Sequence, residues 1–328
     1  MTQAPVLNPE PAFSPKPAVG LEPAPRPAPP PRPAGRVMEH VPCNHCGREV
    51  THGVSNVSRL VRCVHCGLVF VNPRPVFEDL ARQYEGPYFN CPEPTFGGYE
   101  DYEADREDIM RTFRGRLARI RPLLGPGTPR LLDVGCATGI FLEVAREAGW
   151  SVEGLDISAY ALSRARQKGL TIHRGTLTGA SLPAATYDVI TMWDLIEHVP
   201  DPVAVLLECR RLLRPGGVLA ISTPDAGSLL ARVLGGRWLG FRSIDEHLYF
   251  FSRRSMGAML AGAGLDVRGF VAVGKHLALP RLVQRMRFYS RVAARLLRTV
   301  DRALPKLSIY VNPYDTMMVL AAKPAERP

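Results

Sequence analysis

The chain has 328 residues, 46% of them hydrophobic, which is enough for one large domain and a small one. No segment reaches the ~20 consecutive apolar residues of a membrane-spanning helix, and the first residues lack the pattern of a secretory signal. The sequence therefore predicts a cytoplasmic protein. The formal net charge is +10, but residues 281–306 alone hold eight Arg and Lys residues against one Asp. The charge of the whole chain thus does not indicate a nucleic-acid partner.

Proline and alanine dominate residues 1–36. Proline removes backbone donors, and this stretch has little apolar surface to bury. We expect a disordered or polyproline II-like tail here.

Two copies of the pattern Cys-x-x-Cys-Gly follow, at 43–47 and 63–67. Each Gly permits the turn that directs both thiolates of a pair toward one ion. Four thiolates fill the tetrahedral shell of a structural zinc ion, so this metal would not take part in chemistry. Two redox-active or incidental pairs are the alternative. The sequence thus predicts a zinc ribbon at 37–72, with Zn²⁺ bound by Cys43, Cys46, Cys63 and Cys66.

Beyond the ribbon, the pattern changes twice. Residues 73–127 are polar, aromatic and partly helical in pattern, and we expect a helical connector that covers the substrate side. From 128 to 323, short apolar runs alternate with helical segments, which is typical of an α/β protein with a doubly wound, mostly parallel sheet. The predicted strands are 131–134, 151–156, 170–173, 187–193 and 217–222, and the predicted helices are 140–148, 159–168 and 202–213.

The first predicted strand runs into a turn of small residues, LLDVGCATGI, at 131–140. Small residues let the backbone approach a ligand closely, and the free amide groups at the start of a helix suit its polar parts. A dinucleotide-binding motif would need glycine at positions occupied by Ala137 and Ile140, which argues against NAD. A generic corner between strand and helix remains the alternative.

This segment resembles the first motif of the class I S-adenosylmethionine-dependent methyltransferases. Asp133, Gly135 and Gly139 match it, and Ala137 stands where many members have a middle glycine. Alanine fits there if its backbone stays in an ordinary conformation. Asp156 ends the second predicted strand, where a carboxylate can bind both ribose hydroxyls.

Other segments extend the resemblance. Residues 188–202 and 213–219 are similar to the family's fourth-strand motif and to the turn before its fifth strand. A looser resemblance, over 40–323, is to bacterial methyltransferases of the small-molecule and cell-surface-sugar type that carry an N-terminal zinc ribbon. The implied fold is a seven-stranded Rossmann-like methyltransferase sheet, with a sixth strand at 265–273 and an antiparallel seventh, 316–322, at the sheet edge. The residues implied to bind S-adenosylmethionine are Asp133, Gly135, Cys136, Ala137, Gly139, Asp156, Ile157, Thr176, Leu177, Trp193 and Asp194.

Between the last two strands lies a basic insertion, 276–312. Apolar residues recur every three or four positions from Leu282 to Leu304, as in an amphipathic helix. A helix packed on the domain with a solvated Arg face is one interpretation. The other is a lid or membrane-surface helix in which 281–306 contacts anionic lipid, placing the protein peripherally on the inner membrane face. The insertion should emerge near the active site, because the sixth strand is expected to end on the ligand side.

Methyl transfer to a hydroxyl requires removal of a proton, and imidazole titrates near neutrality. His247 and His198 are therefore the candidate catalytic bases, with Asp245 or Glu246 available to orient His247. A purely structural role is the alternative for each histidine.

Three functions remain open from the sequence. The first is methyl transfer to a small-molecule or lipid-linked acceptor such as a sugar. The second is RNA methylation with the ribbon holding the nucleic acid, although the ribbon lacks the Lys, Arg and aromatic residues expected for that role. The third is a non-catalytic zinc-ribbon interaction protein, which the intact acidic and glycine residues of the cofactor motif disfavour.

Overall fold

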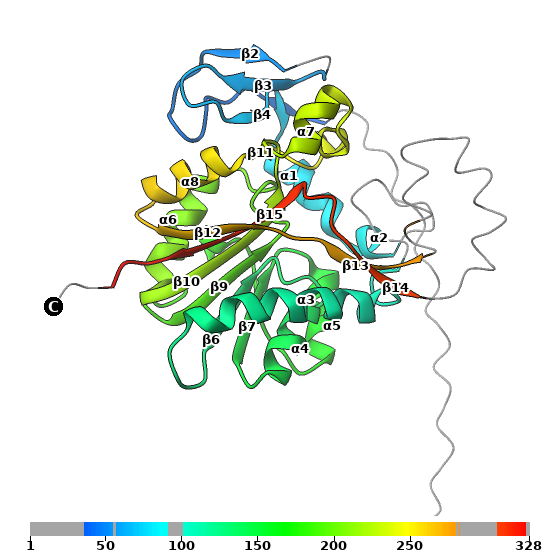
Figure 1. Ribbon diagram of the computed structural model, residues 1–328, viewed down its shortest axis with the longest axis vertical. Coiled ribbons are helices and arrows are strands. Elements are labelled where there is room, and N and C mark those ends of the chain that lie inside the picture. The colour runs from blue at the N-terminus through cyan, green and yellow to red at the C-terminus, as the bar shows by residue number, and fades with distance from the viewer. Residues whose placement is uncertain (1–35, 55–56, 91–100, 280–281, 283–306, 326–328) are drawn as a thin grey trace, which may run out of the picture.

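The computed structural model describes residues 36–54, 57–90, 101–279, 282 and 307–325 (Figure 1). The predicted tail, except for Arg36, lies outside the described residues. The same is true of the basic amphipathic segment 281–306, except for Leu282. The predictions of a disordered tail and of a membrane-contacting helix therefore stay predictions.

The central sheet has seven strands in the order β12-β15-β10-β9-β6-β7-β8. Strand β15 is antiparallel to both of its neighbours, and the other four pairs are parallel. This confirms the predicted doubly wound, mostly parallel sheet. The strands are β6 (Arg130–Val134), β7 (Ser151–Asp156), β8 (Thr171–Arg174), β9 (Tyr187–Trp193), β10 (Leu213–Pro224), β12 (Asp266–Ala272) and β15 (Thr316–Ala322).

The predicted place of the last strand was wrong. β15 does not lie at the sheet edge but between β10 and β12, so β12 forms that edge. Its residues pair on both sides: Val319 is opposite Ile221 of β10 and Phe270 of β12. The physical reason is visible in the residues themselves, because 317–322 is an unbroken apolar run that is buried throughout, as in an interior strand.

Helices cover both faces of this sheet (Figure 1). On one face lie α3 (Arg106–Ile120), α4 (Ile140–Glu147) and α5 (Ala159–Gln167), and on the other lie α6 (Pro202–Leu212) and α8 (Arg253–Gly262). Successive strand residues alternate between the two cores: Leu131 packs with α3 and α4, whereas Leu132 packs with α6 and α8. Because β6, β7, β8, β9 and β10 are parallel, the loops at their carboxyl ends lie on one side of the sheet, where open α/β sheets bind ligands.

The N-terminal segment forms a second, four-stranded sheet in the order β11-β4-β3-β2. Its strands β2 (Thr51–Gly53), β3 (Leu60–Cys63) and β4 (Val69–Val71) come from the predicted ribbon, whereas β11 (Tyr249–Phe250) comes from the large domain. The ribbon therefore pairs through backbone hydrogen bonds with the segment that follows His247.

Shorter elements complete the described chain. Strand β1 (Met38–Glu39) pairs with β5 (Arg74–Pro75), and β13 (Lys275–Ala278) pairs with β14 (Ser308–Val311). The short helices are α1 (Phe77–Ala81), α2 (Gly86–Phe89) and α7 (Leu229–Leu234), with 3₁₀ turns at Arg82–Tyr84, Arg121–Leu123, Leu177–Gly179, Gly235–Arg237 and Leu239–Ser243.

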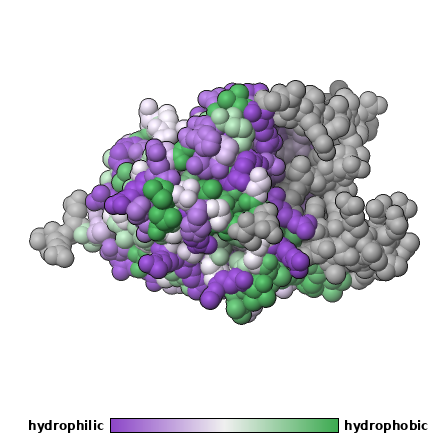
Figure 2. Space-filling model, turned by 90° about the horizontal axis from the view of Figure 1, so that it is seen from above, coloured by the Kyte–Doolittle hydropathy of each residue, from purple (hydrophilic) through white to green (hydrophobic). Residues whose placement is uncertain are grey.

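Seen from the ribbon side, hydrophilic and hydrophobic residues are interspersed over the surface (Figure 2). Among the described residues, no helix combines the length and the apolar character needed to cross a bilayer.

Candidate functional site

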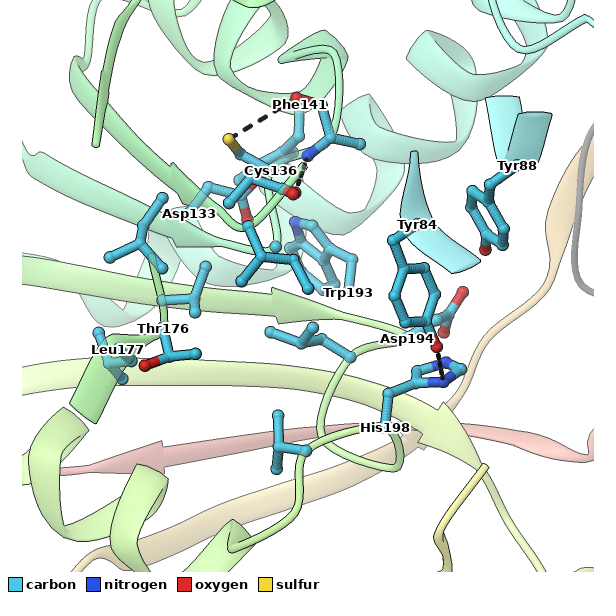
Figure 3. Close-up of a pocket in the computed structure, with 18 of the residues that line it drawn as sticks. Tyr84, Tyr88, Asp133, Cys136, Phe141, Thr176, Leu177, Trp193, Asp194 and His198 are labelled. Atoms are coloured by element: carbon cyan, nitrogen blue, oxygen red, sulfur yellow. Dashed lines mark hydrogen bonds between the residues drawn. The ribbon is translucent and has the colours of Figure 1, made fainter. Parts of the chain in front are cut away.

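A cavity of about 590 Å³ opens at the carboxyl ends of β6, β7 and β9. Its walls combine loops of the sheet with the connector, from which Tyr84, Tyr88 and Phe113 contribute aromatic side chains. This volume lies within the ~300–1,000 Å³ typical of small-molecule sites. Figure 3 shows the cavity from inside, with Asp133, Cys136 and Trp193 on one side and Tyr84 and His198 on the other.

Nearly all residues predicted to bind the cofactor meet in this cavity. Those that line it are Asp133, Gly135, Cys136, Ala137, Asp156, Ile157, Thr176, Leu177, Trp193 and Asp194. Gly139 is the exception: it does not line the cavity, but it ends the turn that does. It precedes α4 in a left-handed conformation (φ +82°), and a Cβ added there would lie 2.4 Å from Leu170. Glycine is thus required at this position for packing between the turn and the sheet edge.

The middle of the glycine-rich turn departs from our expectation. Ala137 has φ +50°, so its backbone is in the left-handed region and not in an ordinary one. The turn holds this conformation because the Ala137 amide donates to Asp156 Oδ2 at 2.8 Å. The alanine therefore occupies a conformation that suits the middle glycine of the related motif.

Asp156 organises the floor of the cavity. Its other carboxylate oxygen, Oδ1, accepts a hydrogen bond from the Ser158 amide at 2.8 Å, so the carboxylate links the turn after β6 to the start of α5. Burial raises the pKa of this carboxyl group, and the backbone amides partly offset the effect. Each oxygen keeps a lone pair for a further donor, as the predicted contact with two ribose hydroxyls requires.

Asp133 lies deeper, at the end of β6. The side chain is 1% exposed, and Thr191 Oγ1 of β9 donates to its Oδ1 at 2.6 Å. Burial raises the pKa of Asp133 to about 8, and the nearby Asp156 acts in the same direction. The neutral acid is therefore stable in the folded protein near pH 7.

Asp194 belongs to a polar cluster that sequence reasoning missed in part. Its Oδ2 accepts from Lys275 Nζ at 2.7 Å and its Oδ1 from Ser222 Oγ at 2.8 Å. Burial raises the pKa of Asp194, but the charges of Lys275 and Arg116 outweigh burial and hold the pKa well below its usual range. Asp194 is thus ionised, and it anchors β13 against the cavity.

Arg116 of α3 is the second missed cation. It is 3% exposed, donates from Nη1 to Ser222 Oγ at 3.0 Å, and stacks over the Trp193 ring at 5.0 Å. Its Nε and Nη2 have no hydrogen-bond partner among the described residues. A buried guanidinium with free donors at a cavity wall is a site for a carboxylate. No pattern in the sequence indicates this role, because Arg116 reaches the cavity only through the packing of α3 on α4.

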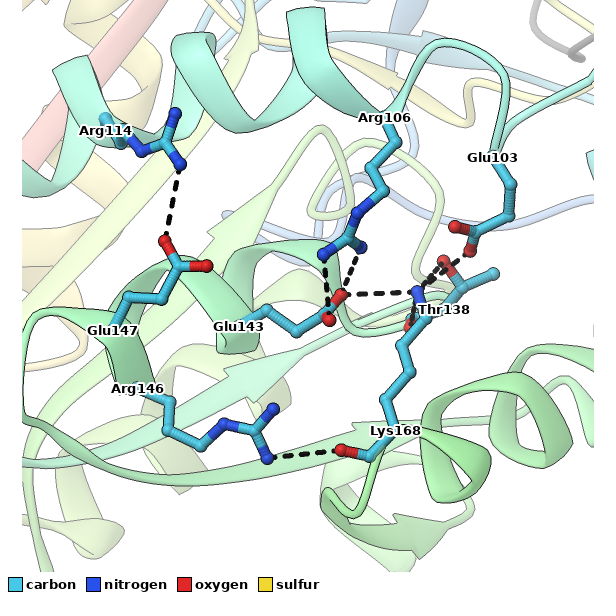
Figure 4. Close-up of polar contacts among 8 residues, drawn as sticks. All are labelled: Glu103, Arg106, Arg114, Thr138, Glu143, Arg146, Glu147 and Lys168. Carbon is cyan, nitrogen blue, oxygen red and sulfur yellow. Dashed lines mark hydrogen bonds and ion pairs between the residues drawn. The ribbon is translucent and has the colours of Figure 1, made fainter. Parts of the chain in front are cut away.

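A network of charges fixes the glycine-rich turn from outside (Figure 4). Lys168 Nζ donates to the Thr138 carbonyl at 3.0 Å and to Glu103 at 2.9 Å. Arg106 of α3 forms a bidentate pair with Glu143 of α4, with Nη2 to Oε1 at 2.9 Å. The pair connects the connector helix directly to the helix that follows the turn.

His198, one of the two predicted bases, lines the cavity. Its Nδ1 lies 2.8 Å from the Tyr84 hydroxyl and 2.9 Å from the Glu246 carbonyl oxygen (Figure 3). A carbonyl can only accept, so Nδ1 carries the proton and Nε2 keeps its lone pair. Tyr84 was not predicted as a site residue, because it comes from a 3₁₀ turn of the connector 114 residues away.

His247 does not line the cavity but packs behind His198, with ring centroids 4.6 Å apart. Asp245 does not orient it, since that carboxylate pairs with Arg59 of the ribbon at 2.6 Å. The expected titration near neutrality is also wrong for this environment. Burial lowers the pKa of His198 to about 4, and burial together with the nearby His198 lowers the pKa of His247 well below its ordinary value. Both imidazoles are neutral at physiological pH.

The four predicted zinc ligands converge in the ribbon. Their sulfur atoms all lie within 4.8 Å of one another, with Cys43 to Cys66 at 3.4 Å and Cys46 to Cys63 at 3.5 Å. A tetrahedral ion with Zn–S bonds of about 2.3 Å needs sulfurs about 3.8 Å apart, so the arrangement fits zinc closely. Gly47 and Gly67, at φ +70° and +77°, form the two predicted turns.

Comparison with known proteins agrees with this site. Residues 102–268, about half of the chain, match a family model described as a methyltransferase domain. The chain is 34% identical over 157 residues to a ubiquinone biosynthesis O-methyltransferase of Thiobacillus denitrificans, covering 44% of this chain and 66% of that protein. A protein of the same name from Haemophilus ducreyi is 41% identical over 105 residues, covering 29% of this chain and 44% of that protein.

One solved structure supports the fold. It is a chain from the complex between the Haloferax volcanii Trm112 methyltransferase activator and a methyltransferase, with a TM-score of 0.51 and 16% identity, covering 69% of this chain and 94% of that chain. At this identity the similarity concerns the fold alone. The family match over about half of the chain and the curated relatives lead to one conclusion: the chain belongs to the methyltransferase family, as a class I S-adenosylmethionine-dependent methyltransferase.

Proposed function

We propose that this enzyme transfers a methyl group to a hydroxyl oxygen of a small acceptor. The observation that carries the proposal is the division of one cavity between two kinds of wall. Asp156 and the glycine-rich turn line one part of the cavity, whereas Tyr84 and His198 line another, and Figure 3 shows Asp133 and Cys136 of the first part set apart from Tyr84 and His198. The relatives named as O-methyltransferases support oxygen as the acceptor atom.

S-adenosylmethionine supplies an activated methyl group on a sulfonium, so the protein needs chiefly to align the acceptor and to deal with its proton. At the cofactor end, Asp156 binds the ribose hydroxyls, and the free Nε and Nη2 of Arg116 bind the carboxylate of the methionine part. Leu177 and Thr176 border the adenine side, while Trp193 and Asp194 border the methyl group.

At the acceptor end, Tyr84 and His198 receive the hydroxyl. The Glu246 carbonyl, which accepts from His198 Nδ1 at 2.9 Å, holds the imidazole with Nε2 unprotonated, and the Tyr84 hydroxyl lies 2.8 Å from the same Nδ1. Aromatic side chains of the connector exclude water around the acceptor, which strengthens polar contacts inside the cavity. A neutral aromatic or sugar ring suits such walls, and a sugar or a lipid-linked molecule remains within this proposal.

The cysteine cluster is proposed to hold one structural Zn²⁺. Four thiolates leave no open coordination position, so the ion acts on stability alone. Contact of residues 281–306 with an anionic membrane is proposed from the sequence only, because the segment lies outside the described residues. Flotation with anionic liposomes at low salt tests that contact.

The function is tested by supplying S-adenosylmethionine with a ¹³C-labelled methyl group to the full-length enzyme. A panel of acceptors should include catechols, phenols and nucleotide sugars, and carbon NMR of the products distinguishes O-methyl from N-methyl and C-methyl groups. We expect an O-methyl product that His198→Ala reduces by ~10²–10⁴-fold. A product methylated only on nitrogen or carbon would contradict the proposal.

A further inference from the structure

The base at the acceptor end of the cavity is a weak one. Burial lowers the pKa of His198 to about 4, so its imidazole takes a proton from a hydroxyl efficiently only when the resulting oxygen anion is stabilised. A positive charge close to the oxygen supplies that stabilisation, because charges attract strongly where water is excluded. A cation between the methyl group of the cofactor and His198 would therefore complete the acceptor end.

Lys275 of β13 lies in that part of the cavity. Its Nζ donates to Asp194 Oδ2 at 2.7 Å, and both side chains line the cavity. Figure 3 shows Asp194 beside His198. Burial lowers the pKa of His247, which packs behind His198, and the charge of Lys275 acts in the same direction. The ammonium is thus within electrostatic reach of the acceptor end.

The backbone on both sides of Lys275 is fixed by hydrogen bonds. The Gly274 amide donates to the Tyr310 hydroxyl at 2.8 Å, and the His276 amide donates to Thr112 Oγ1 of α3 at 2.8 Å. Strand β13 also pairs with β14. A charged donor that is held in place before the reaction needs no reorganisation during it, which makes it effective in stabilising a developing charge.

Asp194 does not cancel the positive charge of this region. Its carboxylate also accepts from the Ser222 hydroxyl, and the charges of both Lys275 and Arg116 act on it. Two cations therefore share one anion, and the net charge of the three groups is positive. The ammonium has three donors, and Asp194 is the one hydrogen-bond partner of Nζ among the described residues. Two donors remain for an acceptor oxygen.

We propose that Lys275 is a further catalytic residue, which donates from Nζ to the acceptor oxygen and stabilises the negative charge on it during methyl transfer. The inference rests on the proposed function and adds a positive charge to the weak base His198. An ammonium within ~4–6 Å lowers the pKa of a hydroxyl by ~1–3. A phenolic hydroxyl, whose ordinary pKa is about 10, is thereby brought within reach of a weak base.

The chemical step balances with the cofactor and the acceptor alone. The hydroxyl proton passes to His198 Nε2 and from there to solvent water, while Lys275 keeps its own protons. The acceptor oxygen forms a bond to the methyl carbon as the carbon–sulfur bond breaks, and the electron pair of that bond stays on the sulfur.

The test uses para-nitrophenol as the probe, because its phenolate absorbs at a longer wavelength than the neutral phenol. The probe is added to full-length enzyme saturated with S-adenosylhomocysteine, in a weakly acidic buffer in which the free probe is mainly neutral. We expect the phenolate band on the wild type, since Lys275 should lower the pKa of the bound phenol by ~1–3.

Three variants isolate the charge of Lys275. Lys275→Met keeps the length of the side chain without its charge and should show the phenol band. Lys275→Arg keeps the charge and should show the phenolate band. Lys323→Met is the matched control and should behave as the wild type, because Lys323 Nζ donates to the Leu213 carbonyl at the start of β10, away from the cavity.

Turnover in the labelled-methyl assay provides a second readout. Lys275→Met should lower kcat by ~10²–10³-fold, and Lys275→Arg should restore part of it. Affinity for S-adenosylhomocysteine should stay close to that of the wild type in both, because the contact with Asp156 is untouched. Lys275→Gln, whose amide can still donate to Asp194, serves in place of Lys275→Met if that variant does not fold.

A neutral probe on the wild type, a probe that does not bind, or the same phenolate band in Lys275→Met would overturn the inference. An O-methyl product formed alongside such a result leaves the proposed function standing. An N- or C-methyl product from an enzyme whose phenolate band depends on Lys275 would contradict the proposed function instead.

Discussion

At the residue scale, two residues of the cofactor turn, Gly135 and Ala137, adopt left-handed backbone conformations that are unfavourable for residues with a Cβ atom. Gly135 has φ +72°, and a Cβ there would lie 2.9 Å from Leu195. Ala137 adopts a similar conformation with its Cβ present. The hydrogen bond from its amide to Asp156 is what compensates the strain. The turn is therefore built around Asp156 as much as around its glycines.

This strain predicts that Ala137→Gly stabilises the protein. The left-handed conformation costs a residue with a Cβ ~1–2 kcal/mol, and the greater freedom of glycine in the unfolded chain returns ~0.5–1 kcal/mol. We expect a net gain of about 0.5–1 kcal/mol in the free energy of unfolding, measured by urea denaturation. Ala145→Gly, inside α4, is the control and should lose about 1 kcal/mol. A less stable Ala137→Gly protein would show that the turn is not strained.

The buried Asp133 predicts a specific pH dependence. Its pKa is about 8 in the folded protein against an ordinary 3.8, so between these values the unfolded chain gives up a proton that the folded chain keeps. The contribution of Asp133 to the free energy of unfolding is thus fully present below pH 3.8. It falls as the pH rises toward 8, by up to about 1.4 kcal/mol per pH unit. Asp133→Asn should remove that slope.

Urea unfolding without cofactor at pH 5, 6, 7 and 8 measures the difference between wild type and variant. Thr191→Val provides a second arm. It removes the hydrogen bond that lowers the pKa of Asp133, so it should extend the loss of stability to higher pH, and the difference from the wild type should appear at pH 8. Curves for wild type and Asp133→Asn that stay parallel would contradict the assignment.

At the element scale, the ribbon secures both loops that carry the histidines. Strand β4 pairs with β11 just after His247, and the Val71 amide donates to the Leu248 carbonyl at 2.9 Å. On the other loop, Asn44 Nδ2 donates to Asp201 Oδ1 at 2.9 Å, and Asn44 Oδ1 accepts from the Val203 amide. The proposed zinc ion would thus stabilise the acceptor end of the cavity without touching it.

The effect of the Asn44 hydrogen bonds on stability can be measured separately from the effect of zinc binding. Asn44→Ala removes both hydrogen bonds and should cost about 1 kcal/mol while the zinc content stays at one ion per chain. Cys43→Ser should release the ion and destabilise the ribbon more strongly. Metal analysis and hydrogen exchange of β4 and β11 measure both effects. Faster exchange confined to the cysteine variant would mean that Asn44 does not hold the ribbon in place.

At the scale of the whole molecule, the sequence predicted the bounds of individual strands. It did not predict the strand order at the sheet edge or the cavity residues that come from distant elements. Strands β7, β9 and β15 begin and end where predicted, because their apolar runs are bounded by clear turns. The exact place of β15 was wrong, since an apolar run does not say which strands flank it. Tyr84, Arg116 and Lys275 reach the cavity from three separate elements, and no spacing in the sequence relates them.

The central claim is that one cavity binds the cofactor at Asp156 and the acceptor at His198. Calorimetric titration with S-adenosylhomocysteine tests it most directly, on wild type, Asp156→Ala, His198→Ala and the exposed control Asp266→Ala. The account predicts that Asp156→Ala binds roughly 10–100-fold more weakly, since it loses charge-assisted contacts worth about 1.5–3 kcal/mol. His198→Ala and Asp266→Ala should bind as the wild type does. Unchanged affinity in Asp156→Ala, or affinity lost in His198→Ala, would contradict the account.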